Sequence, residues 1–180
     1  MKKYFIVAGE PSGDLHGSKL IKAIKHLNPN SSFMGHGGDS MRNEGMHIIE
    51  HVDSLAIMGF AEVLRHLPRM NKIMRNTVGA IERSKPDRVI LIDYPGFNLR
   101  LAKRLSLLKI PITYFILPQA WAWKQGRVEV LKRFIDQSIS IFPFENDWYK
   151  RHGLRVDYFG HPFVDIEHFN ETTKSFYKRH

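Results

Sequence analysis

The sequence predicts an α/β protein built on a doubly wound parallel sheet. Short apolar segments of strand length alternate with amphipathic segments of helical length along most of the 180 residues. Glycines and polar residues follow the apolar segments repeatedly, as expected where strands end in loops. This alternation indicates successive β–α–β units, in which the connecting helices cover both faces of a parallel sheet.

The first part of the chain opens with a strand, a glycine loop and a helix. Residues 4–8 (YFIVA) form a continuous apolar run, which is typical of a strand buried on both faces. The segment from Gly9 to Gly13 interrupts the run, and a helical stripe then extends from about Asp14 to Leu27. The elements expected next are a strand at 32–34, a loop at 35–38, a helix at 39–44, a strand at 47–49, and a helix with Pro68 in its first turn that runs to about Ser84.

The second part contains the clearest strand, residues 89–92 (VILI), which ends on Asp93. We expect one domain over residues 1–165, followed by a polar segment at 166–180 that is a frayed tail or a docking helix. The elements expected after the clearest strand are a helix at 97–108, a strand at 112–117, a helix at 126–135, a strand at 138–142, a helix at 144–152 and a strand at 156–159.

Composition restricts the classes of partner and compartment. The net charge of +9 favours polyanionic partners such as nucleic acids, anionic lipid head groups or phosphorylated substrates, although a merely solvated basic surface gives the same charge. The chain has no cysteine, and its ten histidines lack the spacing of a metal motif, so we expect no metal site. No apolar stretch approaches the ~20 residues of a membrane span. We therefore expect a cytoplasmic protein with peripheral membrane contact at most.

Polar residues gather where the predicted strands end. Ligands of open parallel sheets bind outside the carboxyl ends of the strands, so the functional residues are expected at that edge. The residues that fall just after predicted strands are Glu10, Ser12, His36, Asp93, Asn98, Gln119, Trp121 and His161.

The glycine loop GEPSGD at 9–14 lacks the spacing of a dinucleotide fingerprint and of a P-loop. Two glycines before a helix still expose backbone N–H groups that can hold a phosphate. Alternatively, the loop is a tight turn with Ser12 or Asp14 as the N-cap of the helix. Both interpretations stay open from the sequence.

Asp93 and two tryptophans are the main candidates for chemistry at this edge. A carboxylate that ends an apolar strand is expected to have a raised pKa, which suits proton abstraction, although Asp93 is also a candidate helix N-cap. Trp121 and Trp123 suit stacking on a sugar or covering an acyl chain, and core packing is the alternative. His161 is more simply explained as structural than as catalytic.

The segment at 58–74 is apolar, rich in methionine and interleaved with cations. An ordinary amphipathic core helix explains this pattern. An interfacial element that lies on a membrane surface explains it equally well.

Seven motifs carry a resemblance to a known family. In order they are GEPSGD at 9–14, GHGGDSM at 35–41, MGFAEVL at 58–64, IDYPGFNLRLAK at 92–103, PQAWAWKQGR at 118–127, IFPFE at 141–145 and FGHPFVD at 159–165. Together they resemble the N-terminal half of the lipid-A-disaccharide synthases. Leu117 departs from the family pattern, in which a small polar residue is expected before the proline.

The resemblance implies the Rossmann-like, acceptor-side domain of a GT-B fold, whose second domain holds most of the donor nucleotide. The implied reaction transfers 2,3-diacylglucosamine from UDP to 2,3-diacylglucosamine 1-phosphate, with inversion, to form a β-1,6-linked disaccharide in lipid A biosynthesis. No cofactor or metal is implied. Because the sequence stops where the donor domain should begin, we expect this half to be inactive alone, and that domain to come from a separate chain if at all.

The resemblance also assigns roles to residues. Asp93 is expected to be the base that deprotonates the acceptor 6-hydroxyl. The residues expected to bind substrate are Gly9, Glu10, Ser12, Gly13, Gly37, Gly38, Asn98, Gln119, Trp121, Trp123 and His161. Those expected to contact acyl chains, or the anionic inner face of the cytoplasmic membrane, are Met58, Phe60, Leu64, Leu67 and Met70.

A different class of function stays open. A chain without a donor domain also fits a non-enzymatic module that binds acylated sugar phosphate or a membrane surface. Nucleic-acid binding fits the charge, but the sequence contains no recognised nucleic-acid motif, so we expect no such partner.

Overall fold

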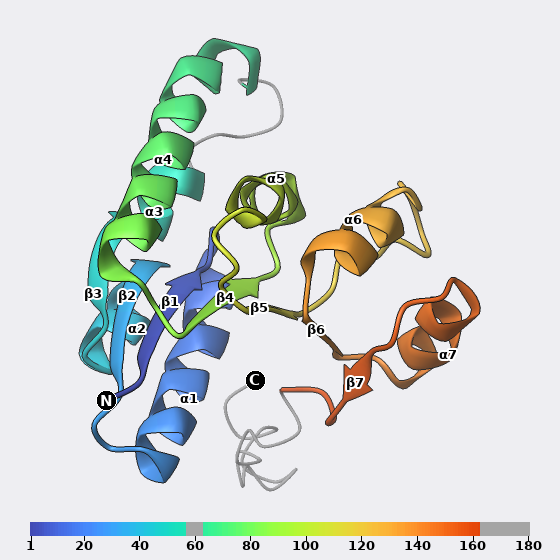
Figure 1. Ribbon diagram of the computed structural model, residues 1–180, viewed down its shortest axis with the longest axis horizontal. Coiled ribbons are helices and arrows are strands. Elements are labelled where there is room, and N and C mark those ends of the chain that lie inside the picture. The colour runs from blue at the N-terminus through green and yellow to red at the C-terminus, as the bar shows by residue number, and fades with distance from the viewer. Residues whose placement is uncertain (57–62, 163–180) are drawn as a thin grey trace, which may run out of the picture.

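The strands form one parallel sheet in the order β3-β2-β1-β4-β5-β6-β7 (Figure 1). The computed structural model describes residues 1–56 and 63–162. Every neighbouring pair of these strands is parallel, as expected from the sequence. The strands are β1 (Lys3–Val7), β2 (Ser32–Gly37), β3 (His47–His51), β4 (Arg88–Ile92), β5 (Ile112–Phe115), β6 (Gln137–Ser140) and β7 (Asp157–Tyr158).

Helices connect the strands and cover both faces of the sheet. They are α1 (Pro11–Leu27), α2 (Asp39–Asn43), α3 (Val52–Ala56), α4 (Val63–Ser84), α5 (Pro95–Leu105), α6 (Arg127–Phe134) and α7 (Pro143–Arg151). The short helix α3 was not expected. The expectation that Pro68 lies in a first turn is wrong, because α4 begins at Val63 and continues through the proline. The ring costs the helix one backbone hydrogen bond there, to the carbonyl four residues earlier.

Side chains of the central strands alternate between two cores. Phe5 and Val7 of β1 point into a cluster shared with α4, α5 and α6. Ile6 and Ala8 point into a second cluster shared with α1 and α2. Figure 1 shows α1 on one side of the sheet, with α4, α5 and α6 on the other. The continuous apolar run at 4–8 is therefore explained by burial on both faces, at about 1.5–3 kcal/mol for each large side chain.

Strand β2 is longer than the sequence indicates. The residues at 35–37 were expected in a loop, but they pair with β1 and β3 and belong to the strand. Gly35 has φ 141°, and a Cβ there would lie 1.9 Å from the Ile6 carbonyl oxygen. The glycine is thus required because β2 approaches β1 closely. Glycines in a sequence usually indicate a loop, and for this reason the strand was predicted too short.

Within the described residues, none of the helices combines the length and the apolar character that crossing a bilayer requires.

Candidate functional site

The two central strands mark the point where the chain reverses its winding direction. From β1 the chain continues to β2 on one side of the sheet, whereas from β4 it continues to β5 on the other. In open α/β sheets, ligands bind at this reversal, outside the carboxyl ends of the strands. The residues at that position are Gly9 and Glu10 after β1, and Asp93 and Tyr94 after β4.

The backbone of Asp93 and Tyr94 is held in an unusual conformation. Both residues have a left-handed backbone, with φ of 45° and 49°. The Asp93 carbonyl accepts hydrogen bonds from Asn98 Nδ2 at 2.8 Å and from the Tyr114 hydroxyl at 2.7 Å. Non-glycine residues rarely adopt this conformation, so it persists only where surrounding contacts impose it. Two buried side chains thus hold the backbone of Asp93 at the end of β4.

The side-chain amide nitrogen of Asn98 donates hydrogen bonds to backbone carbonyls. Asn98 is fully buried, and its amide also reaches the carbonyls of Val7 at 3.4 Å and Ile92 at 3.3 Å. These contacts join the ends of β1 and β4. Asn98 was expected to bind substrate, and these contacts show that it also holds the backbone of Asp93.

The Asp93 carboxyl has the raised pKa that the sequence suggests. Its side chain is half-buried, and this burial is the main cause of the rise, followed by the negative charge of Glu10. The Tyr94 backbone N–H and the Arg127 guanidinium oppose the rise. A carboxyl with a raised pKa holds a proton more readily and is a better general base.

The first glycine loop serves packing as much as binding. A Cβ on Gly9 would lie 2.3 Å from the Tyr94 ring, and one on Gly13 would lie 3.0 Å from the Ala8 Cβ. Helix α1 begins at Pro11 with Glu10 as its N-cap residue, so the proposed cap at Ser12 is wrong. Proline favours the first helical position because its missing N–H needs no partner there. The side chains of Glu10 and Ser12 are left exposed at the sheet edge.

Asp14 is a structural residue, but it does not cap its own helix. It lies inside α1, and its carboxylate accepts backbone N–H bonds from Gly38 at 2.7 Å, Ser40 at 2.9 Å and Met41 at 3.0 Å. It therefore caps α2 across the chain. Gly37 and Gly38 are buried against Met41 and Asp14, so they pack beneath the edge and do not form an open loop.

A second group of side chains lies at the ends of β5, β6 and β7. The Trp121 indole donates a hydrogen bond to Glu145 Oε1 at 3.0 Å and packs edge-on against Phe144 at 5.1 Å. Glu145 is buried, and burial raises its pKa. Glu145 lies in the IFPFE motif at 141–145, but the motif gives it no role of its own. It is the third residue of α7, which starts at Pro143, and a glutamate at this helix position often accepts hydrogen bonds from the first backbone N–H groups.

The remaining predicted residues flank this group. His161 is half-buried, with its ring 5.5 Å from that of Phe142. Gln119 is exposed in the turn that precedes Trp121. Trp123 is partly exposed, and Lys124 and Arg127 lie against its ring. The predicted residues that lie after strands at this edge are Glu10, Ser12, Asp93, Gln119, Trp121, Trp123 and His161. Gly13, Gly37, Gly38 and Asn98 are in buried, supporting positions. The expectation that His36 follows a strand is wrong, because it belongs to β2 and its buried Nε2 lies 2.9 Å from the Thr77 hydroxyl oxygen.

The residues predicted to contact acyl chains or the membrane lie in α4 and in the segment that precedes it. Met58 and Phe60 lie outside the described residues. Leu64 and Leu67 lie on the backbone of α4, and the placement of their side chains is not described. Met70 is half-buried and packs against the larger core cluster.

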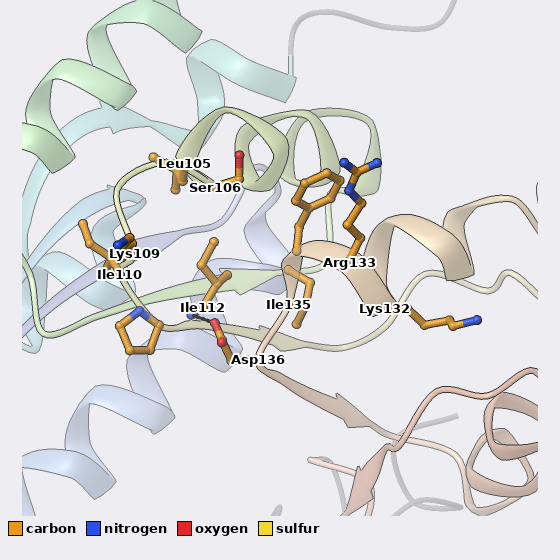
Figure 2. A pocket seen from close by; sticks show the side chains of 11 residues that line it. Leu105, Ser106, Lys109, Ile110, Ile112, Lys132, Arg133, Ile135 and Asp136 are labelled. Carbon is orange, nitrogen blue, oxygen red and sulfur yellow. Dashed lines mark hydrogen bonds between the residues drawn. The ribbon is translucent and has the colours of Figure 1, made fainter.

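A pocket of about 410 Å³ lies far from this edge, at the amino ends of β5 and β6. Figure 2 shows that the side chains of Lys109, Lys132 and Arg133 point in different directions around it. The carboxylate of Asp136 is already occupied by the Ile112 N–H at 2.7 Å. The pocket therefore offers no converging groups for a ligand. No cluster of three or more histidine or acidic side chains suited to a metal occurs in the described parts of the chain.

Comparisons with known proteins support a single family. A family model described as lipid-A-disaccharide synthetase matches residues 4–179. A lipid-A-disaccharide synthase from Alkalilimnicola ehrlichii is 43% identical over 160 residues, which are 89% of this chain and 42% of the relative. The Myxococcus xanthus synthase is 38% identical over 177 residues, or 98% of this chain and 46% of that protein. The chain thus spans less than half the length of these relatives.

Solved structures share the fold at low identity. The S. aureus MnaA–UDP structure superposes with a TM-score of 0.69 at 11% identity, over 99% of this chain and 52% of the other. The UDP-GlcNAc 2-epimerase of Neisseria meningitidis, bound to UDP-GlcNAc, gives a TM-score of 0.60 at 12% identity, over 87% of this chain and 45% of that chain. At these identities the likeness concerns the arrangement of strands and helices.

Proposed function

The chain belongs to the lipid-A-disaccharide synthetase family, and on that premise we propose that its carboxyl sheet edge is the acceptor side of a glycosyltransferase active site. The acceptor is 2,3-diacylglucosamine 1-phosphate, and the donor is UDP-2,3-diacylglucosamine. The observation that carries the proposal is Asp93, a half-buried carboxyl with a raised pKa at the reversal point of the sheet.

Asp93 is the general base of this reaction. The acceptor 6-hydroxyl oxygen forms a bond to the anomeric carbon of the donor as the bond from that carbon to the UDP oxygen breaks. The hydroxyl proton moves to the Asp93 carboxylate, and UDP leaves with the electron pair of the broken bond. Attack opposite to the leaving group inverts the anomeric carbon and produces the β-1,6 linkage.

The surroundings of Asp93 suit this role. Burial and the charge of Glu10 favour the protonated form, so the carboxylate binds the incoming proton more strongly than an exposed aspartate would. The hydrogen bonds from Asn98 and Tyr114 to its carbonyl keep the residue in place before the substrate arrives. Such pre-positioning lowers the entropic cost of reaching the transition state.

The donor is held mainly by the part of the enzyme that this chain does not span. The chain covers 42% and 46% of two of its relatives, and the family resemblance places most UDP contacts in their other half. We therefore expect the chain to bind acceptor but to turn over only when the C-terminal part of a relative is supplied.

The same proposal places the protein at the inner face of the cytoplasmic membrane, where diacylated substrates reside. The outer side of α4 exposes Arg69, Lys72 and Arg75. Each cation near an anionic membrane surface contributes about 1 kcal/mol of binding. The double variant Arg69→Gln/Lys72→Gln should bind anionic vesicles more weakly than the matched variant Lys19→Gln/Lys22→Gln on α1. Equal loss in both variants would assign the binding to net charge alone.

Turnover tests the central proposal. Both lipid substrates are incubated with the chain, with the C-terminal part of the A. ehrlichii relative, and with the two together. Disaccharide and UDP should form only in the mixture. Turnover by the chain alone would contradict the need for a second part. Acceptor binding without turnover in any sample would favour a non-enzymatic binding module.

A further inference from the structure

The loop between β5 and α6 presents an aromatic ring with two cations against it. The Trp123 side chain is 48% exposed. The Lys124 ammonium nitrogen and the Arg127 guanidinium carbon each lie 4.6 Å from the centroid of the Trp123 ring. Contacts of this kind hold a cation over an aromatic ring and restrict its freedom. The indole therefore contacts two positive charges at once.

Neither cation has an acidic partner in residues 1–56 and 63–162. Lys132, five residues after Arg127 on α6, pairs with Glu129 at 3.0 Å, but Lys124 and Arg127 form no ion pair among the described residues. Two positive charges repel each other, and an anion that binds near both offsets this repulsion. Their arrangement thus favours an anionic ligand.

The charge of Arg127 also acts on the proposed catalytic residue. Its positive charge opposes the raised pKa values of Asp93, Tyr114 and Tyr149, so the guanidinium lies within electrostatic reach of all three. Asp93 follows β4 and Tyr114 belongs to β5, next to it in the sheet. Lys124 lies in the loop after β5, and Arg127 is the first residue of α6, so the cation pair lies at the carboxyl end of β5, the same sheet edge as Asp93.

We propose that Lys124 and Arg127, positioned by Trp123, form the subsite for the phosphate monoester of the acceptor sugar. This inference rests on the proposed function and adds the group that distinguishes the acceptor from an uncharged glycolipid. A guanidinium binds a phosphate through two parallel N–H bonds, and an ammonium adds a second point of charge. The indole face is in contact with these cations, so Trp123 serves to hold them and not to stack on the sugar.

Lipid binding in neutral detergent micelles tests the subsite. The affinity of the chain for 2,3-diacylglucosamine 1-phosphate and for 2,3-diacylglucosamine is measured by calorimetry. The phosphorylated lipid should bind about tenfold more tightly or better, since hydrogen bonds between charged groups typically contribute more than 1.4 kcal/mol. Arg127→Gln should remove most of this preference and leave the affinity for the dephosphorylated lipid unchanged.

Two further variants separate charge from folding. Lys124→Asn should reduce the preference as well, and asparagine tolerates the left-handed backbone of residue 124, where φ is 57°. Lys132→Gln is the matched control, because that lysine is already paired with Glu129 on the same helix. It should keep the full preference.

The remaining outcomes overturn the subsite. Equal affinity for the two lipids would overturn it and leave the proposed function standing, whereas no affinity for either would contradict both. Binding to UDP and to phosphatidylglycerol vesicles is measured as well, because the donor and the membrane also carry phosphate groups. If Arg127→Gln weakens binding to either of these but not to the acceptor lipid, the cations bind the donor or the membrane and the inference is wrong.

Discussion

Strand β4 has an aspartate just beyond each end, and the two differ in every respect except residue type. Asp87, before the strand, is exposed and accepts hydrogen bonds from the Lys3 N–H at 2.8 Å and the Lys2 ammonium at 3.2 Å. Asp93, after the strand, is half-buried and has Glu10 as a charged neighbour. The pKa of Asp87 is lowered, chiefly by the Lys3 N–H, whereas that of Asp93 is raised, chiefly by burial.

This contrast separates a carboxylate that stabilises the fold from one that is available for chemistry. At the amino edge, the Asp87 carboxylate accepts hydrogen bonds from a backbone N–H and a lysine ammonium, so its ionised form is favoured. At the carboxyl edge the ionised form is disfavoured, which costs stability but yields a base that binds protons more strongly. A residue of this kind is maintained against a stability cost, which indicates function.

The largest expected difference between the two aspartates is in rate. In the chain supplied with a relative's C-terminal part, Asp93→Asn should lower kcat by about 10²–10⁴-fold, as loss of a general base does. Asn also tolerates the left-handed backbone at residue 93. Asp87→Asn is the control and should leave kcat nearly unchanged. A normal kcat in Asp93→Asn would remove Asp93 from catalysis and direct attention to Glu10 and His161.

The next largest effect concerns stability and a third aspartate. Asp14→Ala removes the acceptor for three backbone N–H groups at the start of α2. We expect a loss of roughly 2–4 kcal/mol in the free energy of unfolding, since buried donors are left unpaired. Denaturant titration measures it. A loss below ~1 kcal/mol would mean that water replaces the carboxylate, and that this aspartate resembles the exposed Asp87 more than a buried cap.

A smaller effect is expected at the buried carboxyl of the second group. Trp121→Phe keeps the aromatic contact with Phe144 but removes the donor to Glu145, which should cost about 1–3 kcal/mol of stability. Glu145→Gln keeps an acceptor oxygen and removes a charge that burial disfavours, so its stability should change by less than ~1 kcal/mol. Thermal unfolding of both variants at pH 7 distinguishes them. The reverse order would show that the ionised Glu145 is needed.

The smallest effects are opposite stability changes at the two ends of β4. The lowered pKa of Asp87 provides stability above about pH 3.8, its ordinary pKa, and this is lost as the pH falls through the folded-state value. The raised pKa of Asp93 acts in reverse: stability is lost as the pH rises from 3.8 through its folded-state value. At pH 7, Asp87→Asn should therefore lower the Tm and Asp93→Asn should raise it. Shifts of the same sign would invalidate the comparison.

Much of the fold was predictable because it depends on local patterns. The apolar run at 4–8 and the strand ending at Asp93 are both present in the structure. The predictions were wrong where the role of a glycine, a proline or a polar residue depends on contacts with distant parts of the chain. Gly35 allows β2 to approach the Ile6 carbonyl, Pro68 lies within α4, and Asp14 caps a helix other than its own.

The sequence by itself determined the order of strands and helices apart from α3, and the gathering of polar residues at the carboxyl edge. Both follow from periodicity and from chain direction, which are properties of neighbouring residues. Tertiary structure alone decided which asparagine holds the Asp93 carbonyl, and that the charges of Glu10 and of Arg127, the first residue of α6, act on the Asp93 carboxyl. A pKa depends on burial and on charges brought together by folding. Glu10 and Arg127 lie far from Asp93 along the chain, and only the packed sheet brings their charges to it.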